Sequence, residues 1–371
     1  MTAERKRILI LGGYGTFGSN ISRALAEDPA IELIIAGRSE KKAKAFAQPL
    51  GARGIQFDIF DDVDAQLSVI RPDLIIHTVG PFQSQDYQVA RAAIASGSHY
   101  LDLADARGFV AGIDALDAEA KTAGVSVITG ASSVPCLTAA VLDAHLPHFS
   151  KLESVHYGIS AAQQTSRGVA TTAAILTYVG KPFKALEEGE TKTVYGWQGF
   201  HSVDYPELGS RYFGDCDVPD LALFPRRYPG LKTLRFAAGN QQKVLHLGTW
   251  AVSWLVRTKL FPSLSRMTKP LLGIARLFDP LGNDKSGFHV FMAGKDERGA
   301  DVEHRFYIIA RSGHGPHIPC VPATVLAKRF AAGDVPAAGA RACLDLVDLK
   351  TYLRELEPLD ITPLKEGPIY A

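Results

Sequence analysis

Short, mainly apolar runs alternate with amphipathic segments along the first third of the chain. The apolar runs lie at residues 7–11, 31–37, 54–60, 72–80, 99–104 and 125–131. Segments with helical periodicity lie at residues 19–28, 40–50, 88–97 and 112–124. Strands of a parallel sheet are covered on both faces and read as continuous apolar runs, with helices between them. The pattern therefore predicts an α/β fold with a Rossmann-type doubly wound parallel sheet, in a domain of residues 1–135.

The alternation of strands and helices ends after Ser133, and a different pattern follows. Longer runs with alternating polar and apolar residues lie at 154–162, 233–239, 288–296 and 302–311. The last two runs form a hairpin that turns at 297–301. Amphipathic helices are expected at 322–334 and 345–357. We therefore expect a second α+β domain over 136–325, built on a mixed or antiparallel sheet, and a C-terminal helical segment over 326–371.

Composition narrows the class of protein. The chain has 371 residues, 46% of them hydrophobic and 21% charged, with a net charge of only +1. This balance is ordinary for a soluble globular protein and gives the whole chain no attraction to nucleic acid. The four cysteines lie far apart, without the spacing of a metal site, which predicts no metal and buried thiols in a reduced, cytoplasmic protein. The longest apolar stretch, Val244–Val256, is short against the ~20 residues that span a bilayer.

A glycine-rich loop, "GGYGTFG", connects the first strand to the first helix. Gly13, Gly15 and Gly18 have the G-x-G-x-x-G spacing, with a strand before and a helix after. The first glycine permits the tight turn, the second lets backbone approach a pyrophosphate, and the third lets the helix pack closely. The amino end of that helix offers free N–H groups to phosphate oxygens. The loop therefore predicts a dinucleotide site.

The end of the second strand selects the form of the dinucleotide. NAD-selective proteins carry Asp or Glu there, whereas this chain reads "AGRS", with Arg38 and Ser39. A guanidinium grips a 2′-phosphate in bidentate fashion, so the predicted cofactor is NADP(H). Asp58, after the third strand, bonds the adenine amino group or belongs to a surface turn.

Several further motifs resemble the saccharopine dehydrogenase-like NADP-binding oxidoreductase family. They are "GGYGTFG", "AGRS", "GPFQSQDYQVARAAIASGSHYLDLAD" at 80–105 and "GASSVPCLTAAVLD" at 130–143. The resemblance implies a second α+β domain whose sheet serves in dimerisation, and hence a homodimer. It also implies that the C-terminal segment packs back on the Rossmann domain. The family hosts saccharopine and carboxynorspermidine formation and lipid enoyl reduction, so it implies a reaction type more strongly than a substrate.

The loops after the strands supply the candidate site residues. Gly80, Pro81 and Phe82 end the fourth strand sharply and press backbone or ring against the nicotinamide. The predicted cofactor-binding residues are Gly12, Gly13, Tyr14, Gly15, Thr16, Phe17, Gly18, Arg38, Ser39, Asp58, Gly80, Pro81, Phe82 and Ser133. The candidate proton donors are Asp102, Asp105 and Tyr87, with structural alternatives of a loop brace, a helix cap and a core ring respectively.

Residues 221–278 form a stretch of the chain with ten basic residues and no Asp or Glu. Apolar runs interleave with these basic residues. The stretch is either a surface for anionic lipid headgroups, an entry channel for an apolar or acidic substrate, or a core helix with basic flanks that face an acidic partner.

The expected function is an NADP(H)-dependent oxidoreductase. Its hydride transfer runs to or from an imine, an amino-acid adduct or an unsaturated lipid. The alternatives are a membrane-peripheral enoyl reductase on lipid substrates and a non-catalytic NADPH-binding sensor or scaffold.

Overall fold

The computed structural model describes residues 5–165, 168–261 and 263–370, and the chain divides into two compact units. The first unit comprises Met1–Ala139 and His317–Glu355, and the second comprises Ala140–Pro316 and Leu356–Ala371. The helix α7 (Thr138–His145) contains the first crossing between them. Neither unit is therefore made from one continuous segment.

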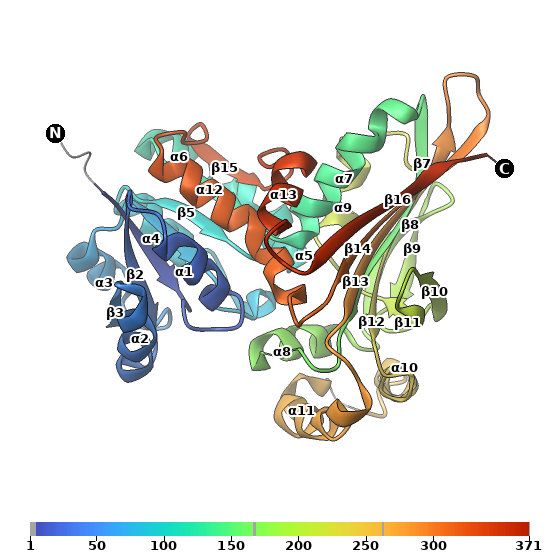
Figure 1. Ribbon diagram of the computed structural model, residues 1–371, viewed down its shortest axis with the longest axis horizontal. Helices are drawn as coiled ribbons and strands as arrows, with labels where there is room; N and C mark the ends of the chain where they lie inside the picture. The colour runs from blue at the N-terminus through green and yellow to red at the C-terminus, as the bar shows by residue number, and fades with distance from the viewer. Residues whose placement is uncertain (1–4, 166–167, 262, 371) are drawn as a thin grey trace. The chain divides into compact units, whose positions relative to one another are not determined.

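A seven-stranded sheet forms the centre of the first unit (Figure 1). Its strands are β1 (Lys6–Leu11), β2 (Ile31–Gly37), β3 (Arg53–Gln56), β4 (Leu74–His77), β5 (His99–Asp102), β6 (Ser126–Thr129) and β15 (Gly339–Ala342). Every pairing is parallel, in the order β15-β6-β5-β4-β1-β2-β3. The strand order reverses between β1 and β4, which confirms the predicted doubly wound sheet.

Helices cover both faces of this sheet. They are α1 (Gly18–Ala26), α2 (Glu40–Ala47), α3 (Val63–Ile70), α4 (Gln88–Ala95), α5 (Arg107–Ala111), α6 (Asp117–Ala123), α12 (Val321–Ala331) and α13 (Leu349–Leu356). Leu9, Ile75 and Val127 pack on one face with side chains of α3, α4 and α6. Leu74 and Ile128 point to the other face, toward α12. Two covered faces explain why the strands are continuously apolar.

The second unit is built on a mixed sheet, as predicted. Its main path is β10 (His201–Tyr205), β11 (Gly209–Asp215), β12 (Thr233–Asn240), β7 (Lys151–Ala161), β13 (Ser286–Lys295), β14 (Asp301–Ala310) and β16 (Ile361–Tyr370). The strands β8 (Pro182–Glu187) and β9 (Glu190–Tyr195) pair beside β12. β12 and β7 are parallel, and β13 and β14 form the expected hairpin. The helices are α8 (Val169–Tyr178), α9 (Asp220–Arg227), α10 (Lys243–Arg257) and α11 (Thr268–Arg276).

The C-terminal segment differs from the predicted arrangement. Residues 326–371 were assigned as a whole to a helical segment on the Rossmann domain. In the structure, β15 extends the first sheet beside β6, whereas β16 pairs with β14 in the second sheet. The segment is divided between the two sheets because β15 adds to an edge of the first sheet and β16 adds to an edge of the second.

All four cysteines are buried and free of disulfides, as their spacing predicted. In the described part of the chain, no helix is both long and apolar enough to cross a membrane.

Candidate functional site

The glycine loop between β1 and α1 is shaped by contacts that exclude side chains. A Cβ atom on Gly18 would lie 2.2 Å from the Gly12 carbonyl oxygen, and one on Gly12 would lie 2.8 Å from Thr78 Oγ1. Gly12 also has φ +76°, in the left-handed region. Ser22 Oγ donates to the Gly13 carbonyl at 2.8 Å and fastens the loop to α1. The sequence therefore folds this loop tightly against the start of the helix.

The amino end of α1 follows directly on the glycine loop. Within the described residues, no side-chain hydrogen bond caps this helix at Phe17, and the Ser19 and Asn20 backbone N–H groups donate to the carbonyls of Gly15 and Phe17 at 2.9 and 3.1 Å. The helix dipole places partial positive charge at this end, which attracts anions. A Cβ on Gly15 would contact only the Gly12 carbonyl oxygen within 4 Å. The loop therefore fits a pyrophosphate at the position where Rossmann domains bind one.

Tyr14 links the glycine loop to the end of β2. Its hydroxyl oxygen accepts a hydrogen bond from the Ser39 backbone N–H at 3.1 Å. Its ring lies over Gly37, where a Cβ would approach ring atoms to 2.6 Å. Tyr14 thus fills the space beside the strand end that an acidic side chain would need.

Arg38 follows Gly37 and is exposed. In the ranges that the structure describes, no ion pair involves its guanidinium. Ser39 caps α2 by accepting a hydrogen bond from the Lys42 backbone N–H at 3.4 Å. An unpaired guanidinium beside a capped helix is suited to a phosphate group.

The loop after β3 contributes Asp58 and an aromatic ring. Asp58 Oδ1 accepts from the Phe60 N–H at 3.1 Å, which braces the loop as a turn. Phe60 is 73% exposed, unusual for a large apolar side chain. Its exposure could not be predicted from the sequence, although Phe60 stands two positions after the predicted Asp58. An exposed ring at this edge of the sheet can stack on an adenine base.

The Gly80–Phe82 turn follows β4 at the same edge of the sheet. The Phe82 ring is buried and packs against the rings of His77 and Phe109, at centroid distances of 5.0 and 5.3 Å. Gln85 Nε2 donates to the carbonyls of Val79 and Pro81 at 2.6 and 3.2 Å, which fixes the turn. The Phe82 side chain thus belongs to the core, and the turn presents its backbone.

Asp105 lies in the loop after β5 and contacts the preceding loop. Its Oδ1 accepts a hydrogen bond from Gln83 Nε2 at 3.0 Å. Removal of water raises the pKa of the Asp105 carboxyl group, and the Gln83 hydrogen bond offsets this only in part. Among the described residues, Gln83 Oε1 is buried without a hydrogen-bond partner. The pair therefore combines a carboxyl group that favours its proton with an unsatisfied acceptor.

Asp102 is placed differently, at the buried end of β5. It has no exposed surface, and its Oδ1 accepts from the Ala104 and Gly130 N–H groups and from Thr129 Oγ1 at 2.8–2.9 Å. Burial raises the pKa of Asp102 to about 6, against the lowering effect of these hydrogen bonds. In this arrangement the carboxyl group braces the loops after β5 and β6.

The other two candidates are also engaged. The Tyr87 hydroxyl donates to the Phe109 carbonyl at 2.6 Å, and burial raises the pKa of Tyr87. Ser133 is buried, and its carbonyl accepts from Thr138 Oγ1 at 3.3 Å. The catalytic roles of Asp102, Asp105 and Tyr87 and the cofactor contact of Ser133 stay predictions.

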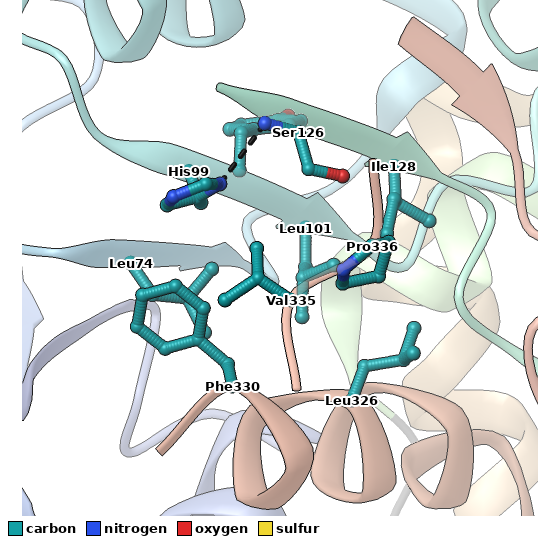
Figure 2. A pocket seen from close by; sticks show the side chains of 10 residues that line it. Leu74, His99, Leu101, Ser126, Ile128, Leu326, Phe330, Val335 and Pro336 are labelled. Carbon is teal, nitrogen blue, oxygen red and sulfur yellow. Dashed lines mark hydrogen bonds between the residues drawn. The ribbon is translucent and has the colours of Figure 1, made fainter. Parts of the chain in front are cut away.

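A hollow between α12 and the amino ends of β4, β5 and β6 is lined mostly by apolar side chains (Figure 2). Leu74, His99 and Ser126 are the first residues of β4, β5 and β6, and Phe330 faces them from α12. His99 Nδ1 accepts from the Ser126 N–H at 2.9 Å. Ligands of doubly wound sheets bind beyond the carboxyl ends of the strands, so this hollow at their amino ends is not the dinucleotide site.

No group of three or more metal-ligating side chains occurs in the part of the chain that the structure describes. The candidate site is thus a dinucleotide cradle with a carboxyl group beside it.

The geometry of this cradle agrees with comparison to known proteins. Residues 8–128 match the family described as the saccharopine dehydrogenase NADP binding domain. This region of the first unit is similar to that family. The resemblance that its motifs predicted is thereby confirmed, and the cofactor of this saccharopine dehydrogenase-type domain is NADP(H).

Solved structures of low sequence identity share the fold of the whole chain. Saccharopine dehydrogenase (L-Glu forming) from Saccharomyces cerevisiae is 14% identical, with a TM-score of 0.70 over 98% of this chain and 100% of that chain. Homospermidine synthase from Legionella pneumophila, in complex with NAD, is 12% identical, with a TM-score of 0.61 over 97% and 91%. The Rossmann-like sheet and the mixed second sheet are therefore a saccharopine dehydrogenase fold.

One curated relative matches a shorter region. 4-Hydroxy-tetrahydrodipicolinate reductase from Syntrophomonas wolfei is 27% identical over 94 residues, which is 25% of this chain and 35% of the relative. The match spans about a third of that protein's length.

Proposed function

We propose that this chain is an NADP(H)-dependent oxidoreductase that reduces or forms the C=N bond of an imine or amino-acid adduct. The observation that carries the proposal is the combination of the tight glycine loop at the amino end of α1 with exposed Arg38, beside a β2 end that Tyr14 closes to an acidic side chain. The names of the similar proteins support it, because saccharopine and homospermidine are both secondary amines.

The residues of the chain fit the dinucleotide along its length. The loop Gly12–Gly18 would hold the pyrophosphate, Arg38 the 2′-phosphate and Phe60 the adenine face. Gln83 Oε1, buried and unsatisfied, would accept a hydrogen bond from the nicotinamide carboxamide. When bound, NADPH supplies the hydride, and the protein supplies orientation and electrostatics.

Asp105 is the proton donor we favour among the three candidates. Its surroundings raise the pKa of its carboxyl group, and Gln83 fixes one of its oxygens. The Tyr87 hydroxyl and Asp102 Oδ1 instead hold backbone in place, whereas Asp102 Oδ2 makes no such contact among the described residues. A carboxyl group that keeps its proton to higher pH can transfer it to nitrogen as the imine is reduced.

The cofactor assignment is tested with Arg38→Ala, with Arg53→Ala as the control at an exposed arginine on the amino end of β3. Loss of a charge-assisted phosphate contact is expected to weaken NADPH binding by about tenfold or more and to leave NADH binding unchanged. Fluorescence titration of both dinucleotides measures this. An unchanged ratio of NADPH to NADH affinity in the variant would refute the role of Arg38.

The reaction is tested by following NADPH absorbance with mixtures of amines and oxo acids, and with enoyl thioesters as lipid-like substrates. Asp105→Asn is expected to lower the rate about 10²- to 10⁴-fold while NADPH still binds. The control Asp114→Asn, at an exposed carboxylate, is expected to keep the rate of the unaltered chain. Equal rates in the two variants would exclude Asp105 as the donor. Tight NADPH binding with no turnover of any substrate would favour the sensor or scaffold alternative.

A further inference from the structure

The helix α10 of the second unit exposes several large apolar side chains. Its exposed positions include Val244, Leu247, Trp254 and Leu255, which recur at helical spacing, and Val244 is 65% exposed. Its inward positions are His246 and Ser253, both without exposed surface, and Val256, which is 4% exposed. A surface helix of a globular protein normally turns its large apolar side chains inward and its polar ones to water.

The helix α11 and its flanking turns also expose large apolar side chains. Leu277, Leu281 and Leu260 are each more than 70% exposed, and Ile274 is about half exposed. Isolated apolar residues on a surface are ordinary, but a contiguous apolar patch indicates an interaction site.

The two helices belong to one surface. Leu176 of α8, Val256 of α10 and Leu264 form a buried cluster, against which Leu271 of α11 packs. Figure 1 shows α10 and α11 next to each other beside the mixed sheet of this unit. We call the outward side chains of residues 243–281 on these helices and turns the α10–α11 face.

Basic side chains border the apolar part of this face. Lys243 and Arg257 stand at the two ends of α10, and Lys269 and Arg276 stand at the two ends of α11; all four are exposed. Within the described residues, none of these four takes part in an ion pair. Residues 221–278 contain no Asp or Glu. The one acidic residue within 243–281, Asp279, accepts a hydrogen bond from Gln163 Nε2 at 2.8 Å. Lys243 lies over the Tyr212 ring, and Arg257 lies over the Tyr195 ring and donates to Gln198 Oε1 at 2.7 Å. The face therefore combines exposed apolar side chains with an excess of cations at the helix ends.

We propose that the α10–α11 face docks on the surface of an anionic lipid bilayer. Apolar side chains enter the boundary between headgroups and acyl chains, while the bordering cations contact lipid phosphates. The exposed indole of Trp254 suits the headgroup level. A second copy of the chain is a poorer occupant, because it would bring the same positive borders together.

This inference does not rest on the oxidoreductase activity. It is tested with the full chain by flotation with vesicles of phosphatidylcholine and with an equimolar mixture of phosphatidylcholine and phosphatidylglycerol, at low and high salt. The chain is expected to float with the anionic vesicles at low salt and to be released by high salt, because the electrostatic attraction is screened.

Two sets of variants separate the apolar contribution to vesicle binding from the electrostatic contribution. Val244→Glu combined with Leu277→Glu is expected to abolish flotation, while Val69→Glu, at an 80% exposed position on α3, preserves it. Lys269→Gln and Arg276→Gln are each expected to weaken binding roughly fivefold, and the control Lys350→Gln is not. NADPH titration verifies that each variant is folded.

Absence of flotation of the unaltered chain with anionic vesicles at low salt would overturn the proposal. So would flotation of the double glutamate variant equal to that of Val69→Glu. Sedimentation equilibrium provides the remaining outcome: a dimer that Leu277→Glu dissociates, without vesicle binding, would assign the face to a second copy and reject the bilayer.

Discussion

The buried carboxyl group of Asp102 braces loops of the candidate site and also affects the free energy of unfolding. Its Oδ1 joins three donors from the loops after β5 and β6, and Tyr100 of the same strand is hydrogen-bonded to His77 Nδ1 at 3.0 Å. Burial lowers the pKa of His77 to about 3, so this imidazole is neutral near neutral pH. The polar atoms behind the cradle therefore form a braced layer in which His77 is neutral, while the pKa of Asp102, at about 6, lets its carboxyl group titrate.

The raised pKa of Asp102 predicts a pH dependence of stability. Its pKa is about 6 in the folded chain against 3.8 when exposed, so the folded state binds more protons between these values. The stabilisation is complete below pH 3.8 and is lost as the pH rises through about 6, by about 3 kcal/mol in all. Asp102→Asn keeps an oxygen acceptor but removes this titration.

The measurement is the free energy of unfolding of both proteins by denaturant across pH 4 to 7. We expect the variant to gain on the unaltered chain as the pH rises, by about 2 kcal/mol over that window, because part of the full change lies below pH 4. A difference between the two proteins that does not change with pH would show that Asp102 titrates alike in the folded and unfolded states.

At the scale of elements, the strands and loops that a local residue pattern determines were the ones predicted best from the sequence. β1, β2, β4, β5 and β6 were visible because burial on both faces requires continuous apolar runs. The glycine loop was visible because close backbone contacts such as that of Gly18 with Gly12 admit no side chain. Arg38 could be proposed as a 2′-phosphate contact because the residue after β2 faces the ribose in this fold, and its role stays a prediction.

Other elements could not be predicted because distant segments define them. β15 has the sequence "GARA", which carries no strand pattern, and it forms only because β6 offers a parallel edge. β16 contains two prolines and pairs at the edge of the second sheet. Phe60 escaped notice because exposure of an aromatic side chain is a property of the fold.

The candidate proton donors illustrate the same limit within the site. Asp102 and Asp105 are three positions apart and looked equivalent in the sequence. The fold buries one of them under backbone donors and leaves the other partly exposed beside Gln83. Their difference depends on the loops after β4 and β6, which lie far from both in the sequence.

At the scale of the whole molecule, the chain passes between the two units more than once. The first unit takes α12 and β15 from residues 317–355, far from its other elements in the sequence. Leu326 and Phe330 of α12 face Leu74 and Ile128 of the sheet, and β15 completes the edge beside β6 (Figure 2). The N-terminal third therefore has the residues of the cradle but lacks one cover of its own core.

This interleaving predicts that a fragment of residues 1–139 does not form a rigid nucleotide-binding domain. The sheet face that α12 covers would be exposed to water, and an uncovered apolar face of this kind favours a loosely packed state. We expect the fragment to bind the dye ANS, to melt over a broad range and to bind NADPH weakly. Addition of a peptide of residues 317–355 is expected to restore a sharp transition and raise NADPH affinity, whereas a peptide of the same composition in scrambled order is not. Calorimetry and NADPH titration measure both effects, and a fragment that melts sharply and binds NADPH like the full chain would show that the returning segment is dispensable for the cradle.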